Sequence, residues 1–212
     1  MKIGIINYGI GNINSVVGAL NNLGADYIVI EKQNEFDLID KLILPGIGNF
    51  TKCKNILDEK NFTSIIREKV LTEFIPILGI CLGMQLLASE GSEGSNNNFV
   101  AGLNLIKGKV ISLRELGSKL VLPHIGWNNI YIKKKSPIIK NIPEDTDFYF
   151  VHNYAYTKID KKSILAEASY GIKFPAIINN KNIWGTQFHP EKSSKAGMEI
   201  IKNFVNIENV KN

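Results

Sequence analysis

The stretch Ile75-Pro76-Ile77-Leu78-Gly79-Ile80-Cys81-Leu82-Gly83 joins an apolar strand, Ile75–Ile80, to a helix that begins within Met84–Ala88. A strand that stops at one residue, with glycine two positions before and two positions after it, has the spacing of a nucleophile elbow. The glycines relieve crowding in the turn, which exposes the central side chain. The stretch therefore predicts a strand–turn–helix unit of an α/β fold, with Cys81 at its tip.

The segments before this elbow alternate between strand and helix. Apolar runs at Lys2–Asn7, Tyr27–Ile30 and Lys41–Leu44 are typical of buried strands. Apolar residues at helical spacing occur in Ile13–Leu23 and in Phe62–Leu71. This alternation predicts an α/β fold with a flavodoxin-like, mostly parallel central sheet and helices on both faces.

The second half of the chain changes to short strand-like segments, which follow the Gly-, Ser- and Asn-rich loop Glu90–Asn98 and precede a last helix at Gly197–Val205. The predicted strands are Leu103–Ile106, Lys109–Ser112, Asn129–Ile132, Phe148–Tyr154, Ala176–Asn179 and Ile183–Gln187. We interpret them as antiparallel hairpins that complete one sheet system. Because no linker, repeat or low-complexity tract is long enough to divide the chain, residues 1–212 are expected to form a single domain.

The chain is basic but lacks the pattern of a nucleic-acid-binding protein. It has a formal net charge of +5, with lysines concentrated at Lys133–Lys135 and Lys158–Lys162. Only Arg67 and Arg114 are arginines, and no aromatic residues interleave with the lysines, although recognition of phosphates and bases relies on both. We therefore expect no nucleic-acid binding. The lysines are interpreted as solvated loops, or as a basic rim that faces a partner or an anionic substrate.

Cysteine usage and hydropathy point to the cytoplasm. Cys53 and Cys81 are the only cysteines and form no disulfide framework, which fits a reducing compartment. The N-terminus starts directly in a strand and lacks the features of a signal peptide. The longest apolar stretch, Phe74–Ala88, is interrupted by proline and glycine and is too short to span a bilayer. We expect a cytoplasmic protein without membrane contacts.

A second constellation lies near the end of the chain, in Gly185-Thr186-Gln187-Phe188-His189-Pro190-Glu191. In an extended segment, residues two apart point to the same side, so Glu191 can orient the imidazole of His189. The other ring nitrogen is then free to face a thiol. Cys81 supplies one at the start of a helix, where free N–H groups stabilise negative charge. These residues predict a Cys–His–Glu triad for nucleophilic catalysis.

A third motif, Leu44-Pro45-Gly46-Ile47-Gly48-Asn49-Phe50, follows a predicted central strand. Its glycines allow backbone N–H groups to approach a substrate closely. We expect the backbone N–H groups of Gly48 and of Leu82, which follows the nucleophile, to form an oxyanion hole.

Other motifs predict no further chemistry. The turn Gly9-Ile10-Gly11-Asn12-Ile13-Asn14 has Asn14 where a dinucleotide-binding turn needs glycine. His124 and His152 are not at metal-ligand spacing, and Cys53 has no neighbouring histidine or acid. We expect no cofactor, no metal and an inert Cys53.

Together these motifs resemble the class I, or triad, glutamine amidotransferases. Gly79–Gln85 is similar to their nucleophile motif, and Gln187–Glu191 is similar to their His–Glu motif. Within that family, the chain resembles the glutaminase subunits of imidazole glycerol phosphate synthases. The stretches that carry this closer resemblance are Pro123-His124-Ile125-Gly126-Trp127-Asn128, Tyr149-Phe150-Val151-His152, Leu44–Phe50 and Ser193, within a match from Lys2 to about Phe204.

The resemblance implies a role for each matched residue. The triad would be Cys81, His189 and Glu191. Glutamine would be held by Gln85 and Glu93, with backbone groups near Gly48 and around Asn153 and Tyr154. The partner interface or ammonia exit would include Trp127, Asn128 and Tyr149. Two departures weaken the match: Glu90–Asn98 is less acidic than is usual in the family, and Asn153 stands where serine or threonine is common.

The resemblance also implies a reaction and a partner. Glutamine would be hydrolysed to glutamate and ammonia through a thioester on Cys81. Ammonia would then pass to a TIM-barrel cyclase subunit, in a heterodimer that makes imidazole glycerol phosphate for histidine biosynthesis.

Three alternatives stay open at this point. The chain could be a paralogous glutaminase subunit of another synthase, for example one that modifies surface sugars. It could be a stand-alone γ-glutamyl hydrolase that uses the same triad. It could also be a non-catalytic binding or scaffold subunit, although an intact triad argues against that role.

Overall fold

The computed structural model describes residues 1–95 and 98–208, and its centre is an eight-stranded sheet in the order β2-β1-β3-β4-β14-β13-β12-β9. Five of these strands pair in parallel: β2 (Asp26–Ile30), β1 (Lys2–Ile6), β3 (Lys41–Gly46), β4 (Ile77–Cys81) and β14 (Ile183–Thr186). Numbered along the chain, these parallel strands follow the order 2-1-3-4-5 of flavodoxin-like folds. The predicted fold class is confirmed.

Antiparallel strands extend the sheet beyond β14. They are β13 (Lys173–Asn180), β12 (Ile164–Ser169) and β9 (Tyr131–Ile132), each paired with the strand before it in the sheet order. No strand is predicted from the sequence at β12, and the pairing of β12 with β13 contains register shifts.

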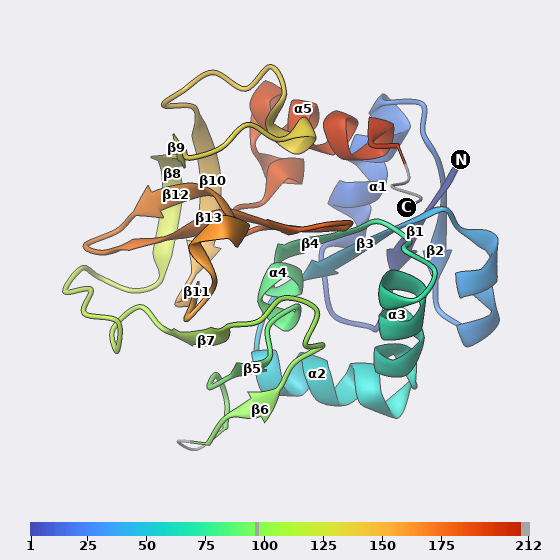
Figure 1. The fold of residues 1–212 in the computed structure, drawn as a ribbon, viewed down its shortest axis with the longest axis horizontal. Coiled ribbons are helices and arrows are strands. Elements are labelled where there is room, and N and C mark those ends of the chain that lie inside the picture. The colour runs from blue at the N-terminus through green and yellow to red at the C-terminus, as the bar shows by residue number, and fades with distance from the viewer. Residues whose placement is uncertain (96–97, 209–212) are drawn as a thin grey trace.

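Helices cover both faces of the sheet (Figure 1). One hydrophobic core joins α1 (Ile13–Asn22) and α5 (Ser194–Asn206) to the sheet, and the other core joins α2 (Phe50–Glu59), α3 (Phe62–Leu71) and α4 (Leu82–Leu86) to the opposite face. Successive residues of β3 alternate between these cores: Leu42 and Leu44 belong to the second and Ile43 to the first. A strand covered on both faces has to be apolar throughout, which explains the continuous apolar runs in the first half of the sequence.

The remaining strands form two smaller sheets rather than one sheet system, so that part of the sequence interpretation is wrong. One sheet pairs β8 (His124–Asn129) with β10 (Asp147–His152); the other contains β11 (Tyr154–Thr157), β7 (Lys109–Ser112), β5 (Glu90–Gly91) and β6 (Val100–Ala101). The predicted strand Phe148–Tyr154 is divided at Asn153, whose carbonyl accepts a hydrogen bond from the Leu113 N–H at 2.8 Å. Beyond this break the chain leaves β8 and continues along β7.

The predicted strand Leu103–Ile106 is also wrong. Its N–H groups donate to the carbonyls of residues 86–88, at and just beyond the end of α4, instead of to a neighbouring strand. The apolar side chains that suggested a strand are buried in the core beneath α4. The predicted strand Asn129–Ile132 is likewise divided, because it covers the end of β8 and all of β9.

Candidate active site

The carboxyl ends of β3, β4 and β14 meet at one edge of the central sheet. Gly46 lies opposite Cys81, and Thr186 lies opposite Ile80. A cavity of about 400 Å³ opens at this edge, where parallel sheets of this type place their ligands. It is lined by Ile47, Gly48, Cys81, Leu82, Gln85, Glu93, Pro123, Val151, His152, Asn153, Tyr154, His189 and Lys192.

Cys81 is held in a strained backbone conformation at the junction of β4 and α4. Its φ of 52° lies in the left-handed region, which non-glycine residues rarely adopt. Such strain persists only where the surroundings impose it, and it clusters at functional sites. The Cys81 sulfur lies 3.7 Å from the Val151 carbonyl oxygen and 3.8 Å from Gln187 Nε2.

The glycines on either side of Cys81 are required by close backbone packing. A Cβ atom on Gly83 would lie 1.8 Å from the carbonyl oxygen of Leu44 in β3, and one on Gly79 would lie 2.6 Å from the carbonyl oxygen of Gly83. The helix that follows the nucleophile therefore lies directly against the neighbouring strand. This contact fixes the turn that presents Cys81 to the cavity.

His189 and Glu191 form the second part of the candidate triad. His189 Nδ1 lies 2.7 Å from Glu191 Oε1, and both side chains are buried. A carboxylate only accepts, so Nδ1 carries a hydrogen, and Nε2 is the nitrogen left for chemistry. Nε2 is buried and has no hydrogen-bond partner among residues 1–95 and 98–208. Residues 190–192 form a short 3-10 turn, so the extended geometry assumed from the sequence is wrong although the contact itself is made.

The charge on His189 follows from its neighbours. Burial acts to lower the pKa of His189, but the nearby Cys81 sulfur and the Glu191 carboxylate outweigh it and raise the pKa to about 10. These neighbours therefore favour a charged His189 imidazolium close to Cys81, a pairing that cysteine nucleophiles use.

Ser193 and Tyr149 hold the His189 segment in place. Ser193 Oγ donates to the His189 carbonyl at 2.6 Å and accepts from the Tyr149 N–H at 2.9 Å, while the His189 N–H donates to the Tyr149 carbonyl at 2.9 Å. Tyr149 was predicted near the interface or ammonia exit; the structure also gives its backbone this supporting contact.

Gln85 and Gln187 connect the cavity wall to the nucleophile. Gln85 Nε2 donates to the Tyr154 carbonyl at 2.9 Å and to Gln187 Oε1 at 3.1 Å. Gln187 Nε2 is thereby directed at the Cys81 sulfur, 3.8 Å away. Sequence reasoning quoted Gln187 in a motif but assigned it no role. Its position two residues before His189, at the end of a central strand, is the signal that could have identified it.

The predicted oxyanion and substrate residues line the same cavity with different contacts. Gly48 has a φ of +94°, which favours glycine, and the Leu82 N–H begins α4. Glu93 accepts a hydrogen bond from the Phe50 N–H at 2.9 Å, so it also caps α2, and burial raises its pKa. Asn153 and Tyr154 contribute the segment between β10 and β11.

The three residues predicted near the partner interface lie on the β8–β10 sheet, where Trp127 is paired with Tyr149. Trp127 is 54% exposed; Ile125, two residues before it on β8, is 59% exposed, and Val121, in the segment that precedes β8, is 81% exposed. Asn128, by contrast, directs its amide towards His124 and the Ser169 carbonyl. An exposed apolar surface, which we call the β8 surface (Val121, Ile125 and Trp127), therefore borders Pro123, which lines the cavity.

His124 and His152 form a buried pair that predicts acid sensitivity. Burial lowers the pKa of His124 to about 4 and that of His152 to about 3. Because the unfolded chain binds these protons near pH 6.5, the free energy of unfolding should fall as the pH decreases from about 6.5 to 4. Thermal melts across this range should show a steeper loss for the wild type than for His124→Asn, which removes one of the two groups. Equal slopes for the two proteins would contradict the assignment.

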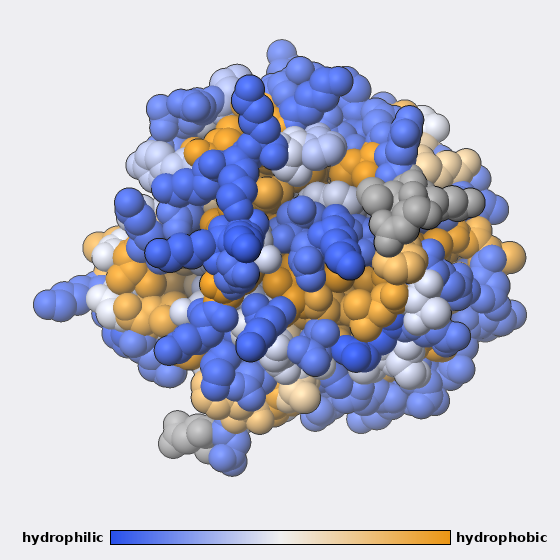
Figure 2. All heavy atoms as spheres, in the orientation of Figure 1, coloured by the Kyte–Doolittle hydropathy of each residue, from blue (hydrophilic) through white to orange (hydrophobic). Residues whose placement is uncertain are grey.

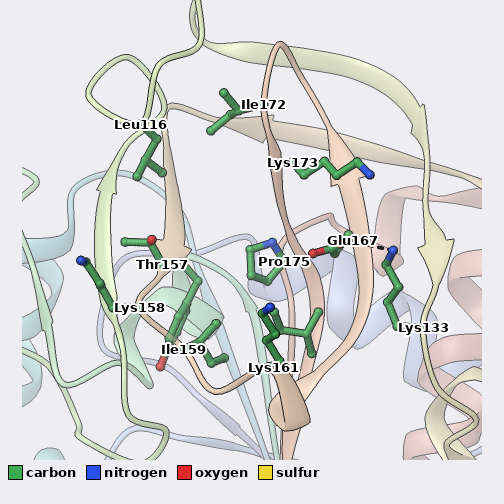
Figure 3. A pocket seen from close by; sticks show the side chains of 12 residues that line it. Leu116, Lys133, Thr157, Lys158, Ile159, Lys161, Glu167, Ile172, Lys173 and Pro175 are labelled. Atoms are coloured by element: carbon green, nitrogen blue, oxygen red, sulfur yellow. Dashed lines mark ion pairs between the residues drawn. The ribbon is translucent and has the colours of Figure 1, made fainter.

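A second cavity of about 630 Å³ lies away from Cys81 (Figure 3). Lys133, Lys158, Lys161 and Lys173 surround it, and Lys133 pairs with Glu167 at 3.0 Å. The lysines of both predicted basic patches thus contribute to one rim. No cysteine or histidine lines this cavity, so it offers no nucleophile like that of the first.

The described residues contain no group of three or more His, Cys, Asp or Glu side chains arranged to hold a metal ion. The face shown in Figure 2 is largely hydrophilic, with hydrophobic residues exposed between hydrophilic ones. No helix within residues 1–95 and 98–208 has the length and apolar character needed to cross a membrane.

Comparisons with known proteins agree with this site. The family model described as glutamine amidotransferase class-I matches residues 4–207. An imidazole glycerol phosphate synthase subunit HisH from Leptospira borgpetersenii is 37% identical over 97% of this chain and 100% of its own length. The subunit of the same name from Bacillus subtilis (strain 168) is 42% identical over 95% of this chain and 94% of its own length.

Solved structures show the same fold at lower identity. A crystal structure of a glutamine amidotransferase has a TM-score of 0.74 and 17% identity, covering 96% of each chain. The structure of PurLQS from Thermotoga maritima has a TM-score of 0.73 and 17% identity, covering 97% of each chain. With the family match over nearly the whole sequence, the chain belongs to the class-I glutamine amidotransferases and, within them, to the HisH subunits of imidazole glycerol phosphate synthase.

Proposed function

We propose that this chain hydrolyses glutamine to glutamate and ammonia, using Cys81 as the nucleophile, His189 as the acid and base, and Glu191 to orient His189. The observation that carries the proposal is the convergence, in one cavity, of a strained cysteine and an imidazole bonded to a buried carboxylate. Membership of the HisH group supports the same reaction.

In the first half-reaction, the Cys81 sulfur attacks the side-chain amide carbon of glutamine and the carbonyl oxygen takes up the negative charge. The backbone N–H groups of Leu82 and Gly48 are the proposed donors to that oxygen. His189 gives its Nε2 proton to the departing ammonia when the C–N bond breaks, which leaves a glutamyl thioester on Cys81.

In the second half-reaction, water attacks the thioester. Neutral His189 takes a proton from this water, and the C–S bond breaks to release glutamate and the Cys81 sulfur anion. His189 is again charged, so the pair returns to its starting state. Glu191 stabilises the imidazolium in both halves, while Gln187 donates an N–H group towards the sulfur.

Glutamine is proposed to bind among Gln85, Glu93, Asn153 and Tyr154, all of which line the cavity beside Cys81. The Gln85 amide donates both of its N–H groups to protein acceptors, so its side-chain oxygen is the atom proposed to accept a hydrogen bond from the substrate. The half-buried Glu93 carboxyl lies at the start of α2, where it accepts from the Phe50 N–H, and a substrate ammonium group there would offset its partial desolvation.

Ammonia released into water would become mostly ammonium, which is not a nucleophile, so the acceptor reaction needs a sheltered route. We propose that a cyclase subunit with a TIM-barrel fold covers the β8 surface and receives ammonia there, to make imidazole glycerol phosphate for histidine biosynthesis. Support comes from the exposure of Trp127, Ile125 and Val121 beside Pro123 of the cavity wall. Burying such apolar side chains is a typical source of binding energy at an interface.

The test is glutamine hydrolysis by the purified chain, alone and with the cyclase subunit and its nucleotide ligand. We expect slow hydrolysis alone and an increase of at least about tenfold with the liganded partner. Pro123 beside the β8 surface and Gly48 line the same cavity, so docking at that surface is proposed to reorganise the oxyanion loop Pro45–Gly48. Equal, high rates in both conditions would instead identify a free-standing hydrolase. Absence of hydrolysis in both would contradict the proposed function.

A further inference from the structure

A series of hydrogen bonds, which we call the β8 relay, runs from the half-buried Asn128 through two buried imidazoles to the wall of the active-site cavity. Asn128 Nδ2 lies 3.2 Å from His124 Nε2, and His124 Nδ1 lies 2.9 Å from His152 Nε2. His152 Nδ1 lies 2.8 Å from the Tyr154 carbonyl oxygen, which also accepts from Gln85 Nε2. The relay therefore ends on the same oxygen that holds Gln85.

The two imidazoles are fixed in place by aromatic packing. His124 is 3% exposed and stacks between Tyr170, at a centroid distance of 4.1 Å, and Phe150, at 5.0 Å. His152 is 6% exposed and packs against Phe174 at 4.9 Å. Neither ring can reach bulk water to replace a lost hydrogen bond, so each bond in the relay has to be made within the protein.

The positions of the hydrogens in the relay follow from its two ends, both of which are backbone carbonyls. Asn128 Nδ2 lies 2.9 Å from the Ser169 carbonyl oxygen, so the side-chain nitrogen has to point this way and also donate to His124 Nε2. His124 then carries its hydrogen on Nδ1 and donates to His152 Nε2. His152 in turn carries its hydrogen on Nδ1 and donates to the Tyr154 carbonyl. Only one arrangement satisfies every bond, and both rings are neutral in it.

The same carbonyl determines the orientation of the groups beyond it. A Gln85 amide turned by 180° would place its oxygen against the Tyr154 oxygen, and two acceptors repel. With Gln85 held as observed, Gln187 has to present its oxygen to Gln85 and its NH₂ group to the Cys81 sulfur. The donor and acceptor directions that are set at Asn128 on β8 therefore determine which group Gln187 presents to the Cys81 sulfur.

We propose that Asn128, His124 and His152 are positioning residues for glutamine hydrolysis, which hold the Tyr154 carbonyl so that the Gln85 amide keeps the orientation needed to bind substrate. This role rests on the proposed function. Asn128 follows Trp127 on β8, and because successive strand residues face opposite sides, the relay lies on the face of β8 opposite to the exposed Ile125 and Trp127.

The hydrogen positions can be tested without measuring activity. His124, His152 and His189 are the only histidines of the chain, so a sample labelled with ¹⁵N-histidine gives three resolvable rings. We expect two neutral rings protonated at Nδ1 that keep this form between about pH 5 and 8, with single variants of each histidine assigning the signals. A ring at position 124 or 152 that is protonated at Nε2, or that titrates across this range, would overturn the relay.

The role in substrate binding is tested by Asn128→Asp, which keeps the side-chain shape but replaces the donor NH₂ by an acceptor. In the complex with the partner, we expect the KM for glutamine to rise about fivefold, the typical worth of one hydrogen bond, and the signals of His124 or His152 to change. The matched control is Asn203→Asp, because Asn203 Nδ2 likewise donates to two protein acceptors, the backbone carbonyls of Ile138 and Lys140, but lies on α5 and does not line the cavity. It should change neither readout.

An unchanged KM together with altered imidazole signals in Asn128→Asp would show that the relay has only a structural role, and would overturn the proposal. If Asn128→Asp does not fold, Asn128→Ala removes the same two donors without adding charge and has the same expected results. Failure of the proposed function itself looks different: the wild-type complex would then release no glutamate at all.

Discussion

The Cys81→Ala variant is expected to lose glutamine hydrolysis almost completely, with kcat lower by about 10⁴-fold or more. The thioester cannot form without the sulfur, and among the residues that line the cavity Cys81 is the only thiol. The unfolding midpoint should stay within a few degrees of the wild type, because the change removes one atom from a side chain at the cavity wall. Glutamate release and thermal unfolding, measured on the same samples, check both statements.

Cys53 provides the matched control for this variant. It is fully buried, its sulfur lies 3.6 Å from the Ile47 carbonyl oxygen, and it does not line the cavity. Cys53→Ala should therefore keep kcat within severalfold of the wild type, and a glutamine-derived electrophile should label it at Cys81. Retention of full activity by Cys81→Ala, or labelling at Cys53, would rule out the assignment of the nucleophile.

The second large effect is expected for folding, in the Gly83→Ala variant. The added Cβ would lie 1.8 Å from the Leu44 carbonyl oxygen and 3.4 Å from the Leu44 side chain, and both belong to a central strand with little freedom to move. A clash of this depth with backbone atoms should lower the free energy of unfolding by about 4 kcal/mol or more, a large part of the stability of an ordinary domain. Chemical denaturation followed by circular dichroism measures this change.

Gly18→Ala makes the same chemical change at a site without the clash. Gly18 lies inside α1, and its added Cβ would have no atom within 4 Å. Alanine is the better helix former, so this variant should gain up to about 1 kcal/mol. If Gly83→Ala were as stable as Gly18→Ala, the close approach of α4 to β3 would be wrong.

The parts that could be predicted from the sequence are those encoded over a few neighbouring residues. The parallel strands are continuous apolar runs, because helices cover both of their faces. The elbow at Cys81 can be recognised in the sequence because the turn has no room for a side chain at positions 79 and 83, so both must be glycine. His189 and Glu191 are close in the chain, so their contact needed no knowledge of the fold, although the turn that makes it was not foreseen.

The parts that escaped prediction depend on contacts between distant segments. Whether Phe148–Tyr154 is one strand or two depends on which strands lie beside it. The residues before Asn153 pair with β8 and those after it pair with β7, and this change of partner cannot be read from the local sequence. Leu103–Ile106 has the apolar character of a strand, but its N–H groups are satisfied by the end of α4. The pairing of His124 with His152 joins two separate strands and has no local signature.

The parallel pairing of β14 with β4 has a consequence for folding of the protein during its synthesis on the ribosome. The strand that carries Cys81 is synthesised roughly a hundred residues before its neighbour in the sheet, which leads to His189. At roughly 5 to 20 residues per second, the nascent chain exposes one apolar edge of β4 for roughly 5 to 20 s. During that interval Cys81 has no base beside it, so the emerging chain cannot hydrolyse glutamine; it does carry an unpaired strand edge, of the kind that chaperones shield from aggregation. Completion of the sheet and completion of the triad are thus one event, which occurs when the last quarter of the chain arrives.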